Sequence, residues 1–575
     1  MMKEKQPSMM VKKYYSMLFG GTLSIMVVSV MLMSDTLIAG IFLGENAVSG
    51  ITLVTPLYSI AAFFGSIFSL GVPIIYSARI GSFNKKDADR VFQTGVLMTI
   101  ITGIVLFIVI SLFGKSFIQI SRPSPEVLDA ALDYLSFIKY TVLLLPFQAL
   151  LSECVFADGD ETISTISSLT QAIGNVVFSL ILSRVIGVRG IALASFLFYL
   201  VSLLIDCIHL FRSNNTLRIG LSFSFDTVRD VVRYSAIDAG TYLFIGILVA
   251  SLNMFVGVRF GSASLVLVSV ISLGRNLQLV FDGVGAAITP ILTIYLSENC
   301  SSGVSKIYHL ARKSAVIEGL IVMIFIWTAS PYVPTLLQIS DPVTAKAAVV
   351  GLCIISVASA FVSALYLVPS YDLLIDRIPL GVFISALRDV LIPAPLAIML
   401  GYFFGIYGVF CGIAIAPILS VLLMRFYLSR KYPEDFPLLL GDKGKIPSFQ
   451  YDLFLEEHRI VEVRDEIGKM LHDHGYDNKC INRLSLLFEE VCMLLKEENE
   501  GTEIIAECSL LLLNDRIRMI LRDTGKTFDI TDSDMKVTSL HSYVVTNIAT
   551  HISYTKNHLP AMSFNRNVFE IKNQM

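Results

Sequence analysis

The sequence predicts an all-α polytopic membrane protein, with twelve transmembrane helices in two six-helix lobes and a small cytoplasmic α/β (α+β) C-terminal domain. Three observations predict this fold class. The 575 residues are 54% hydrophobic and only 16% charged, with a mean hydropathy of +0.70, whereas soluble proteins carry about 25% charged residues. The apolar part of the chain also repeats itself at a fixed offset. Near Tyr432 the composition changes abruptly to charged and polar residues.

The repeat has an offset of 217 residues. The glycines that bound Gly40–Gly44 recur in Gly257–Gly261, and Pro73 recurs as Pro290. Asp35 does not recur, because the equivalent position is a leucine. The repeat indicates two parallel six-helix halves, and repeated halves of this kind place a substrate path at their interface.

Twelve apolar stretches are long enough to cross a hydrocarbon core of about 30 Å, which takes roughly 20 helical residues. They lie near residues 14–43, 48–80, 91–113, 127–157, 162–184, 188–211, 227–258, 262–297, 309–330, 343–370, 376–400 and 404–429. The first stretch exceeds the core of a cleavable signal peptide, so we expect it to remain as an anchor.

Basic residues gather in alternate loops, which places these loops and both termini in the cytoplasm of a multi-pass plasma (inner) membrane protein. The bases on this side are Lys3, Lys5, Lys12, Lys13, Arg79, Lys85, Lys86, Arg90, Arg212, Arg218, Arg229, Arg233, Lys306, Arg312, Lys313, Arg425, Arg430 and Lys431.

We expect five parts in the chain. They are an N-terminal lobe over 1–212, an interlobe linker over 213–226, a C-terminal lobe over 227–431, a second linker over 432–447 and a cytoplasmic domain over 448–575. In the last part, Val461–His474 and Asn482–Glu498 have the spacing of helices. Ser509–Leu513 and Arg516–Leu521 are typical of a β-hairpin, and Arg522–Asp529 is expected to form a loop.

The eight cysteines are scattered without a CxxC motif or a Cys/His pair. The pattern therefore predicts neither a disulfide framework nor a metal site.

A charge inside a span costs roughly 2.5–3.5 kcal/mol at the bilayer centre, so each one needs a partner, a cavity or an interface. Asp35, late in the first span, is either a cavity-facing ion site or an interfacial acid. In the second lobe, Arg275, Gln278 and Asp282 share one helical face. They form either a polar site or an internal charge pair that holds the helix in register, and Arg388-Asp389 poses the same choice.

The fifth span carries a polar stripe. Ser167, Gln171, Asn175 and Ser179 recur every four residues and therefore face one way. Such a stripe either lines a cavity or joins helices by hydrogen bonds.

The apolar region resembles the multidrug and toxic compound extrusion (MATE) transporters of the wider multidrug/oligosaccharidyl-lipid/polysaccharide exporter group. Ser34-Asp35-Thr36 through Gly40 is similar to that family's first span. The stretches 171–179 and 187–195 carry a second similarity. The resemblance covers roughly residues 14–430.

This resemblance implies two six-helix lobes in a V shape and export of organic cations or amphiphiles, driven by inward flow of H⁺ or Na⁺. Asp35 would be the first-helix acid of cation coupling, and Asn175 the asparagine beside it, with Gln171 and Ser179 on the same stripe. Family members often carry an aspartate where this chain has Ser179, so a site with two carboxylates is not expected. A single carboxylate can still bind a proton, or bind sodium with Asn175 and backbone oxygens.

The C-terminal domain resembles the ATP-binding fold of histidine kinases and anti-sigma-factor serine kinases. Glu489 and Glu490 stand where that family has its magnesium-site glutamate, and Asp523 and Gly525 where it has its adenine box. Three departures are Met493 or Leu494 in place of an asparagine, Thr527 in place of a glycine, and no glycine in Val537–His541. Missing oxygen ligands and glycines weaken magnesium and phosphate binding, so we expect neither Mg²⁺–ATP binding nor kinase activity.

Together these patterns predict a transporter and not an enzyme, which exports organic cations or amphiphilic small molecules by proton or sodium antiport and needs no cofactor. Its expected partners are a small-molecule substrate and the lipid bilayer, with no nucleic acid. Two alternatives remain at this point. One is a lipid-linked saccharide flippase, and the other is a membrane-tethered sensor or regulator whose C-terminal domain binds a cytoplasmic protein.

Overall fold

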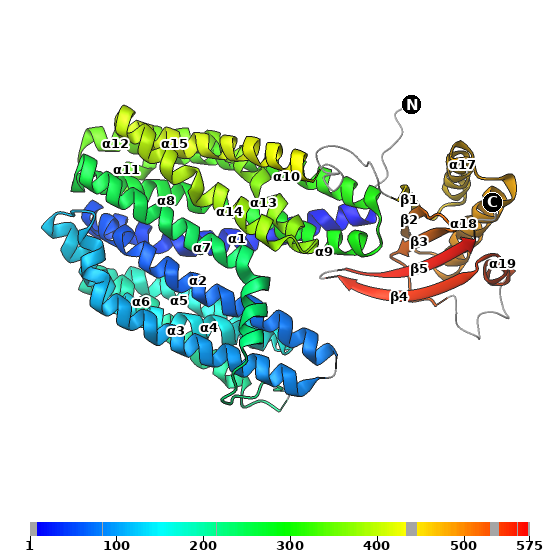
Figure 1. Ribbon diagram of the computed structural model, residues 1–575, viewed down its shortest axis with the longest axis horizontal. Coiled ribbons are helices and arrows are strands. Elements are labelled where there is room, and N and C mark those ends of the chain that lie inside the picture. Colours follow the sequence, from blue (N-terminus) through cyan, green and yellow to red (C-terminus); the bar gives the residue numbers. More distant parts are fainter. Residues whose placement is uncertain are drawn as a thin grey trace. The chain divides into compact units, whose positions relative to one another are not determined.

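The computed structural model of the protein describes residues 8–82, 84–213, 215–432, 446–529, 540–559 and 562–572. It comprises two units. The bundle unit contains Leu23–Asp282 and Ala315–Phe426, and the tail unit contains Met1–Thr22, Gly283–Ser314 and Tyr427–Met575. Figure 1 shows the long helices of the bundle unit and the five-stranded sheet of the tail unit.

The first half of the apolar region forms six helices. They are α1 (Met9–Leu43), α2 (Glu45–Gly81), α3 (Lys85–Gln119), α4 (Pro125–Ala157), α5 (Glu161–Ile186) and α6 (Val188–His209). Polar caps fix several of the starts, since Ser124 accepts a hydrogen bond from the first turn of α4 and Asp160 from the first turn of α5.

The second half is more interrupted. Its elements are α7 (Phe225–Phe260), η1 (Ser262–Leu265), α8 (Val266–Gln278), η2 (Leu279–Phe281), α9 (Asp282–Ser297), α10 (Ser301–Ala329), η3 (Ser330–Tyr332), α11 (Val333–Leu336), α12 (Pro342–Val357), α13 (Ser359–Leu374), α14 (Ile378–Ala386), the π-helical turn η4 (Leu387–Leu391) and α15 (Pro393–Lys431). A break divides α15 at Gly405, whose φ of 67° and ψ of −157° resemble the 64° and −141° of Gly187, the residue between α5 and α6.

The bounds of the helices repeat at the same offset of 217 residues. Shifted by 217 residues, α2 would run from 262 to 298, and the run from η1 to α9 covers Ser262–Ser297. In the same way α4 would run from 342 to 374, where α12 and α13 begin and end. Thr52 and Ser269, themselves 217 residues apart, join their hydroxyls in a hydrogen bond, so these equivalent positions meet at the contact between the two halves.

Nine helices among the described residues are long and apolar enough to cross a membrane, and Ser29–Leu43 and Pro342–Val357 are shorter apolar helices. One of the nine, Ile378–Lys431, has 54 residues. As a straight helix it would be about 80 Å long, far more than a hydrocarbon core of about 30 Å. The break at Gly405 supports two passages for this segment, and the total of twelve spans stays a prediction.

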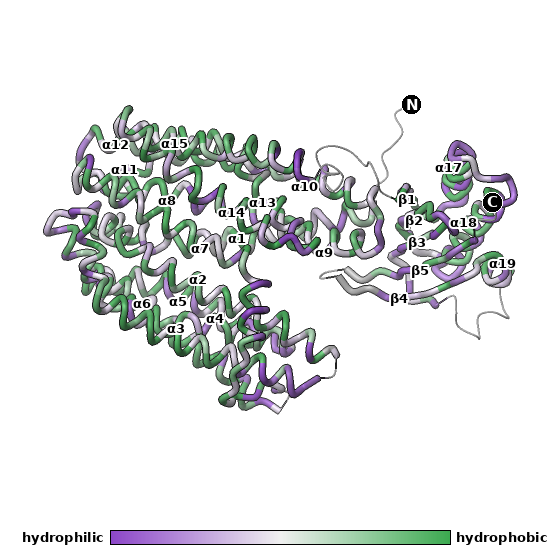
Figure 2. Tube along the Cα trace, in the orientation of Figure 1, coloured by the Kyte–Doolittle hydropathy of each residue, from purple (hydrophilic) through white to green (hydrophobic). Residues whose placement is uncertain are grey.

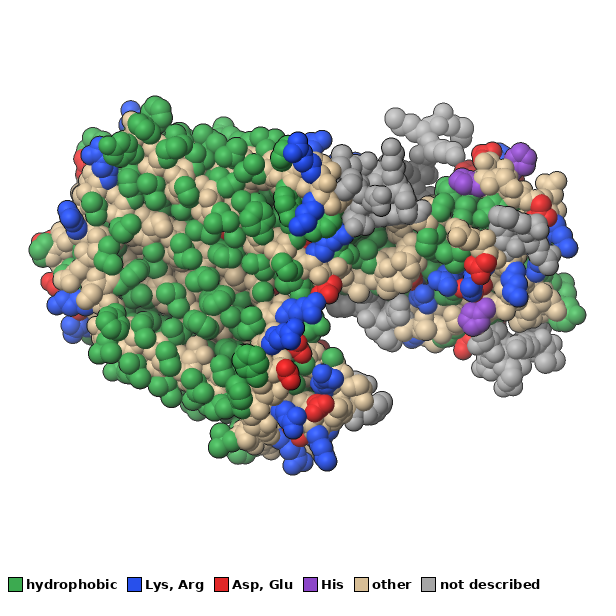
Figure 3. All heavy atoms as spheres, in the orientation of Figure 1, with side chains coloured by type: hydrophobic (Ala, Val, Ile, Leu, Met, Phe, Trp, Pro, Cys, Tyr) green, Lys and Arg blue, Asp and Glu red, His purple; other side chains and the backbone are tan. Residues whose placement is uncertain are grey.

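The bundle unit is apolar outside as well as inside. Figure 2 shows hydrophobic residues along its helices, and Figure 3 shows hydrophobic side chains across its visible face with charged side chains toward its ends. Leu112, Phe113 and Ile321 are among the large side chains that are exposed. Water disfavours apolar patches of this extent. The chain is therefore a multi-pass membrane protein.

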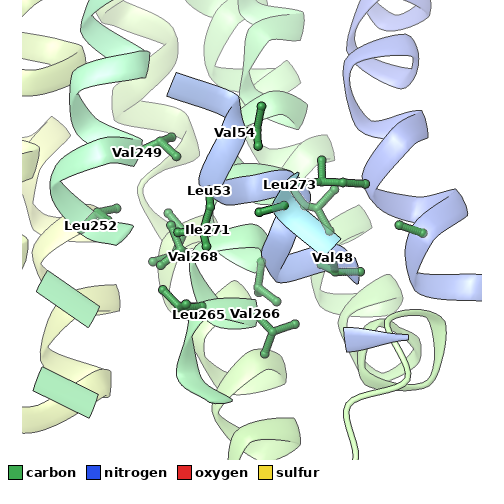
Figure 4. Close-up of a cluster of buried hydrophobic side chains, with 14 of the residues drawn as sticks. Val48, Leu53, Val54, Val249, Leu252, Leu265, Val266, Val268, Ile271 and Leu273 are labelled. Carbon is green, nitrogen blue, oxygen red and sulfur yellow. The ribbon is translucent and has the colours of Figure 1, made fainter. Parts of the chain in front are cut away.

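The two halves meet in an apolar cluster, which Figure 4 shows in close-up. Its labelled members are Val48, Leu53 and Val54 of α2, Val249 and Leu252 of α7, Leu265 of η1, and Val266, Val268, Ile271 and Leu273 of α8. Leu252, the repeat equivalent of Asp35, is fully buried there. The same position in the two halves therefore serves packing in one and carries a carboxylate in the other.

The C-terminal domain is an antiparallel sheet with helices. The strands are β1 (Ser448–Phe454), β2 (Ile505–Leu512), β3 (Arg516–Asp523), β4 (His551–Leu559) and β5 (Met562–Lys572), in the order β1-β2-β3-β5-β4. The helices are α17 (Glu457–Asp473), α18 (Asn478–Glu498) and α19 (Leu540–Ile548). The two expected helices and the expected hairpin are present as α17, α18 and β2–β3.

One boundary differs from the expectation. The sequence predicts a loop at Arg522 and Asp523. They end strand β3 instead, because each pairs with β2 on one side and with β5 on the other. Most of the expected second linker, residues 433–445, lies outside the described residues.

Candidate cation-coupling site

Asp35 on α1 is held by two hydroxyl groups from other helices. Tyr134 on α4 donates a hydrogen bond to Asp35 Oδ2 at 2.6 Å, and Ser195 on α6 lies 3.3 Å from the same oxygen. Asp35 Oδ1 is buried and has no hydrogen-bond partner among the described residues. A buried oxygen without a partner is costly, so it marks a place where a proton or cation would be stabilised.

Asn175 and Ser179 on α5 extend this arrangement. Asn175 Nδ2 donates to Ser195 Oγ at 2.8 Å, and Ser179 Oγ lies 3.4 Å from Asn175 Oδ1. Three of the four residues predicted from the sequence, Asp35, Asn175 and Ser179, therefore lie in one hydrogen-bond network through Ser195. We call these residues with Tyr134 the Asp35 network.

Ser195 can change its hydrogen bond. Its hydroxyl is 3.3 Å from Asp35 Oδ2 and also 3.3 Å from the Ile191 carbonyl one turn earlier in α6. A serine hydroxyl has one proton, so it donates to only one of these oxygens at a time. The choice can follow the charge of Asp35.

The rest of the α5 stripe joins α5 to α6. Ser167 Oγ is 2.6 Å from Ser202 Oγ, and Ser202 lies 3.4 Å from Gln171 Oε1. Gln171 is also within hydrogen-bonding reach of the Tyr199 hydroxyl. Of the two alternatives for the stripe, these contacts favour helix joining, and Gln171 stands one turn away from the Asp35 network.

Sequence reasoning missed the aromatic members of the site. Tyr58 on α2 and Tyr199 on α6 join their hydroxyls at 2.6 Å, and both lie close enough to Asp35 to interact electrostatically. Tyrosines on separate helices give no periodic signal. Ser195 had a different signal, because it is the last residue of the stretch 187–195 that carries the family resemblance.

The second-lobe charges form a closed cluster. Asp389 is fully buried and accepts from Arg275 at 2.7 Å and from Arg388 at 2.6 Å. Arg388 also stacks on the Tyr366 ring, 3.7 Å from its centroid, and lies 3.2 Å from the Thr241 hydroxyl. Every charge here has a partner, as expected of an element that fixes helix register.

An internal pair within the eighth span was one expectation for Arg275 and Asp282, and the structure corrects it. Residues seven apart in a helix are separated by about 10 Å, beyond ion-pair distance, and Arg275 binds Asp389 instead. Gln278 lies 3.4 Å from the Ser359 hydroxyl. Asp282 is exposed and interacts electrostatically with Arg388.

The residues of the predicted nucleotide site have protein partners. Glu489 binds Arg464 at 2.9 Å, and Glu490 binds His541. Asp523 is fully buried and accepts from the Gly525 amide and from Asn565, each at 2.9 Å. Burial raises the pKa of Asp523 to about 6, although these two hydrogen bonds lower it.

Gly525 has a packing role of its own. A β-carbon on Gly525 would lie 2.8 Å from the Asn499 side chain, so the glycine allows a protein contact. Among the described residues, no group of three or more His, Cys, Asp or Glu side chains could hold a metal ion. Residues 537–539 of the expected lid stretch lie outside the described residues, and His541 lies in α19.

Residues 22–181 match the family model MatE. The chain contains a MatE domain. Asp35, Tyr134, Asn175 and Ser179 all fall inside the matched residues, and Ser195 follows them. No curated relative matches the chain.

Solved structures show the same fold around the MatE domain. The chain is similar to the inward-facing conformation of a multidrug resistance MATE family transporter of the MOP superfamily, with 20% identity, a TM-score of 0.64, and coverage of 71% of this chain and 98% of that one. The outward-facing conformation of such a transporter gives 19% identity, a TM-score of 0.57, and coverage of 72% and 94%. A MOP superfamily transporter from Pyrococcus furiosus, described as having a binding pocket of reverse polarity, gives 19% identity, 0.58, and 73% and 96%. These structures are covered almost completely, and the remainder of this chain has no counterpart in them.

Proposed function

We propose that the protein is a secondary-active exporter, which carries organic cations or amphiphilic small molecules outward in exchange for H⁺ or Na⁺ at Asp35. The MatE domain and the transporter fold support export. One observation supports the coupling site above all: Asp35 Oδ1 is a buried carboxylate oxygen without a partner among the described residues.

The Asp35 network supplies the parts of an exchange site. A proton or sodium ion arriving at Oδ1 would neutralise the carboxylate and weaken its attraction for the Ser195 proton. Ser195 could then donate to the Ile191 carbonyl, which lies equally near. Ion occupancy would in this way change the contact between α1 and α6. A ligand shifts a conformational equilibrium only through such differential contacts.

The lipid-linked saccharide flippase is less well supported. Recognition of an anionic headgroup calls for a basic path, whereas the buried Arg275 and Arg388 share the buried Asp389. Asp238 and Asp282 near Arg388 are both exposed acids. Acidic side chains therefore outnumber basic ones in and around this cluster.

The test is transport in proteoliposomes that contain the full chain, with ethidium as the organic cation. An imposed pH gradient and an imposed sodium gradient are applied separately, and the gradient that drives ethidium movement identifies the ion. Asp35→Asn should lower the initial rate of the driven movement more than tenfold. The matched control is Asp133→Asn, which should transport normally. Asp133 lies on α4, as Tyr134 does, and its exposed carboxylate pairs with Arg189 of α6. Failure of both gradients, or normal transport by Asp35→Asn, would contradict the proposal.

A further inference from the structure

The sheet of the C-terminal domain has two chemically different faces. Along β2, Ala506, Cys508 and Leu510 point into the core with α17 and α18, while Glu507 and Ser509 point to the other face. Glu507 and Ser509 are nevertheless fully buried, and so is Arg522 of β3. Charged groups are buried only where something pairs and covers them. This polar face, defined by Glu507, Ser509 and Arg522, is therefore an interface.

The turn between α9 and α10 covers the polar face. Arg522 forms ion pairs with Glu507, at 2.6 Å, and with Glu298 of the turn. Arg566 Nε donates to Glu298 Oε1 at 2.6 Å. The Tyr295 hydroxyl at the end of α9 lies 2.9 Å from both carboxylate oxygens of Glu507. All of these residues belong to the tail unit.

The domain also holds the start of α10. Ser448 Oγ lies 2.9 Å from Ser301 Oγ and accepts from the Ser302 amide at 2.8 Å, and Asp452 forms an ion pair with Lys306. A β-carbon on Gly303 would lie 2.5 Å from the Tyr295 ring, so close packing at this point requires glycine. The domain therefore contacts the end of α9 and the start of α10, which lie on the two sides of their turn.

This contact is suited to reversible docking. Burial of paired charges roughly balances their attraction against lost hydration, so such networks add specificity more than strength. In agreement, burial raises the pKa of Glu507 to about 7 and lowers the pKa of Arg522 to about 10. When the domain leaves the turn, water would hydrate the same charged groups again. The free energy lost on undocking would therefore be small.

These two helices belong to the second repeat. α10 continues as one helix from Ser301 to Ala329, and α9 contains Pro290 five residues before Tyr295. A proline inside a helix is a preferred point of bending. Bending there, or rocking of one repeat against the other, would move Tyr295 and Ser301 against the domain.

We propose that the C-terminal domain is a built-in restraint on the transport cycle: docked through its polar face, it fixes the ends of α9 and α10 at their turn, and its release accelerates transport. The proposal rests on the exporter function.

A reversible cross-link tests the restraint. Ser301→Cys and Ser448→Cys, introduced together in a Cys300→Ser background, place two thiols where the hydroxyls are 2.9 Å apart. Oxidation should form the disulfide and slow ethidium transport at least fivefold, and dithiothreitol should restore the rate. The matched control is each single cysteine variant in the same background, which should not respond to oxidation.

A variant that weakens docking of the domain should have the opposite effect on the transport rate. Glu298→Gln removes the charge shared by Arg522 and Arg566 without touching the core of the domain, and it should raise the initial rate about twofold. Lys496→Gln, which removes an ion pair with Glu457 elsewhere in the domain, should leave the rate unchanged. A cross-link that does not form, or a cross-linked protein as fast as the reduced one, would overturn the restraint. A wild-type protein that transports under neither gradient would overturn the exporter function and the restraint with it.

Discussion

Asp35 and Asp389 are intramembrane aspartates of the two halves with opposite surroundings. Asp35 has neutral donors on one oxygen and no partner on the other among the described residues, whereas Asp389 is enclosed by Arg275 and Arg388. A carboxylate with an unpartnered oxygen can gain and lose a cation at low cost. A carboxylate between two guanidinium groups cannot do so without leaving buried charges unpaired. A duplicated fold can therefore keep one acid for exchange and another for architecture.

The largest effect is expected at Asp35. Asp35→Asn keeps the size of the side chain and its contacts with Tyr134 and Ser195, and it removes the exchangeable charge. Gradient-driven ethidium transport should fall more than tenfold in initial rate, with thermal stability in detergent changed by less than about 1 kcal/mol. A large loss of stability would mean that Asp35 is architectural as well, and the comparison would fail.

Asp389→Asn should show the reverse pattern. It leaves two buried guanidinium groups without their anion, and breaking a buried ion pair costs about 3–5 kcal/mol. We expect a lower unfolding temperature and a lower yield of folded protein, measured by fluorescence-detected unfolding in detergent. Adding Arg275→Gln to Asp389→Asn removes one of the stranded charges and should recover part of the loss. No recovery would indicate that Asp389 acts through something other than these ion pairs.

Tyr134→Phe sharpens the description of the Asp35 side. The substitution removes the shorter of the two hydroxyl contacts with Asp35 and keeps the ring. A hydrogen bond to a charged group contributes about 1.5 kcal/mol or more, so transport should fall about tenfold. Tyr140→Phe, on the same helix, is the matched control for loss of a phenol and should transport normally. Equal rates for Tyr134→Phe and the wild type would remove Tyr134 from the site.

The smallest effect is expected at Glu490 of the C-terminal domain, a partly exposed acid, in contrast to the buried Asp389. Burial lowers the pKa of its partner His541, but Glu490 and Glu497 raise it more, so the net pKa is above the ordinary value. Stabilisation from this pair is therefore complete below about pH 6.5 and is lost as the pH rises through the raised value.

Partly exposed pairs contribute about 0.2–1 kcal/mol. Hydrogen exchange of the α19 amides, corrected for the intrinsic effect of pH, should become faster between pH 6 and pH 8.5. His541→Gln should exchange at the faster rate at both pH values. Protection that is independent of pH in the wild type would show that the pair does not stabilise α19.

Local periodicity explains how much of the site could be predicted. Asn175 and Ser179 are four residues apart in one helix, so their common face follows from helix geometry alone. Ser195 and Tyr134 lie on other helices, and no spacing within a helix reports which neighbour packs against it. The partner of Arg275 was missed for the same reason, since Asp389 is 114 residues away and Asp282 only seemed near along the chain.

The C-terminal domain shows the same division. The pattern of Ser509–Leu513 and Arg516–Leu521 predicted a hairpin, and the spacing in Val461–His474 and Asn482–Glu498 predicted two helices. The pattern could not say what covers Glu507 and Arg522, because charged residues on a strand normally indicate a face in water. Their burial follows from the turn at Glu298, which the chain reaches more than two hundred residues earlier.

Composition and spacing alone establish that this protein crosses a membrane, that its helices repeat at 217 residues, and that Asp35 has no acidic counterpart in the second half. These follow from composition and spacing, which are fixed along the chain. The folded chain alone reveals which donors hold Asp35, which charges enclose Asp389, and which turn receives the polar face of the C-terminal domain. Each of these depends on distances between segments far apart in the sequence, and those distances are set by packing.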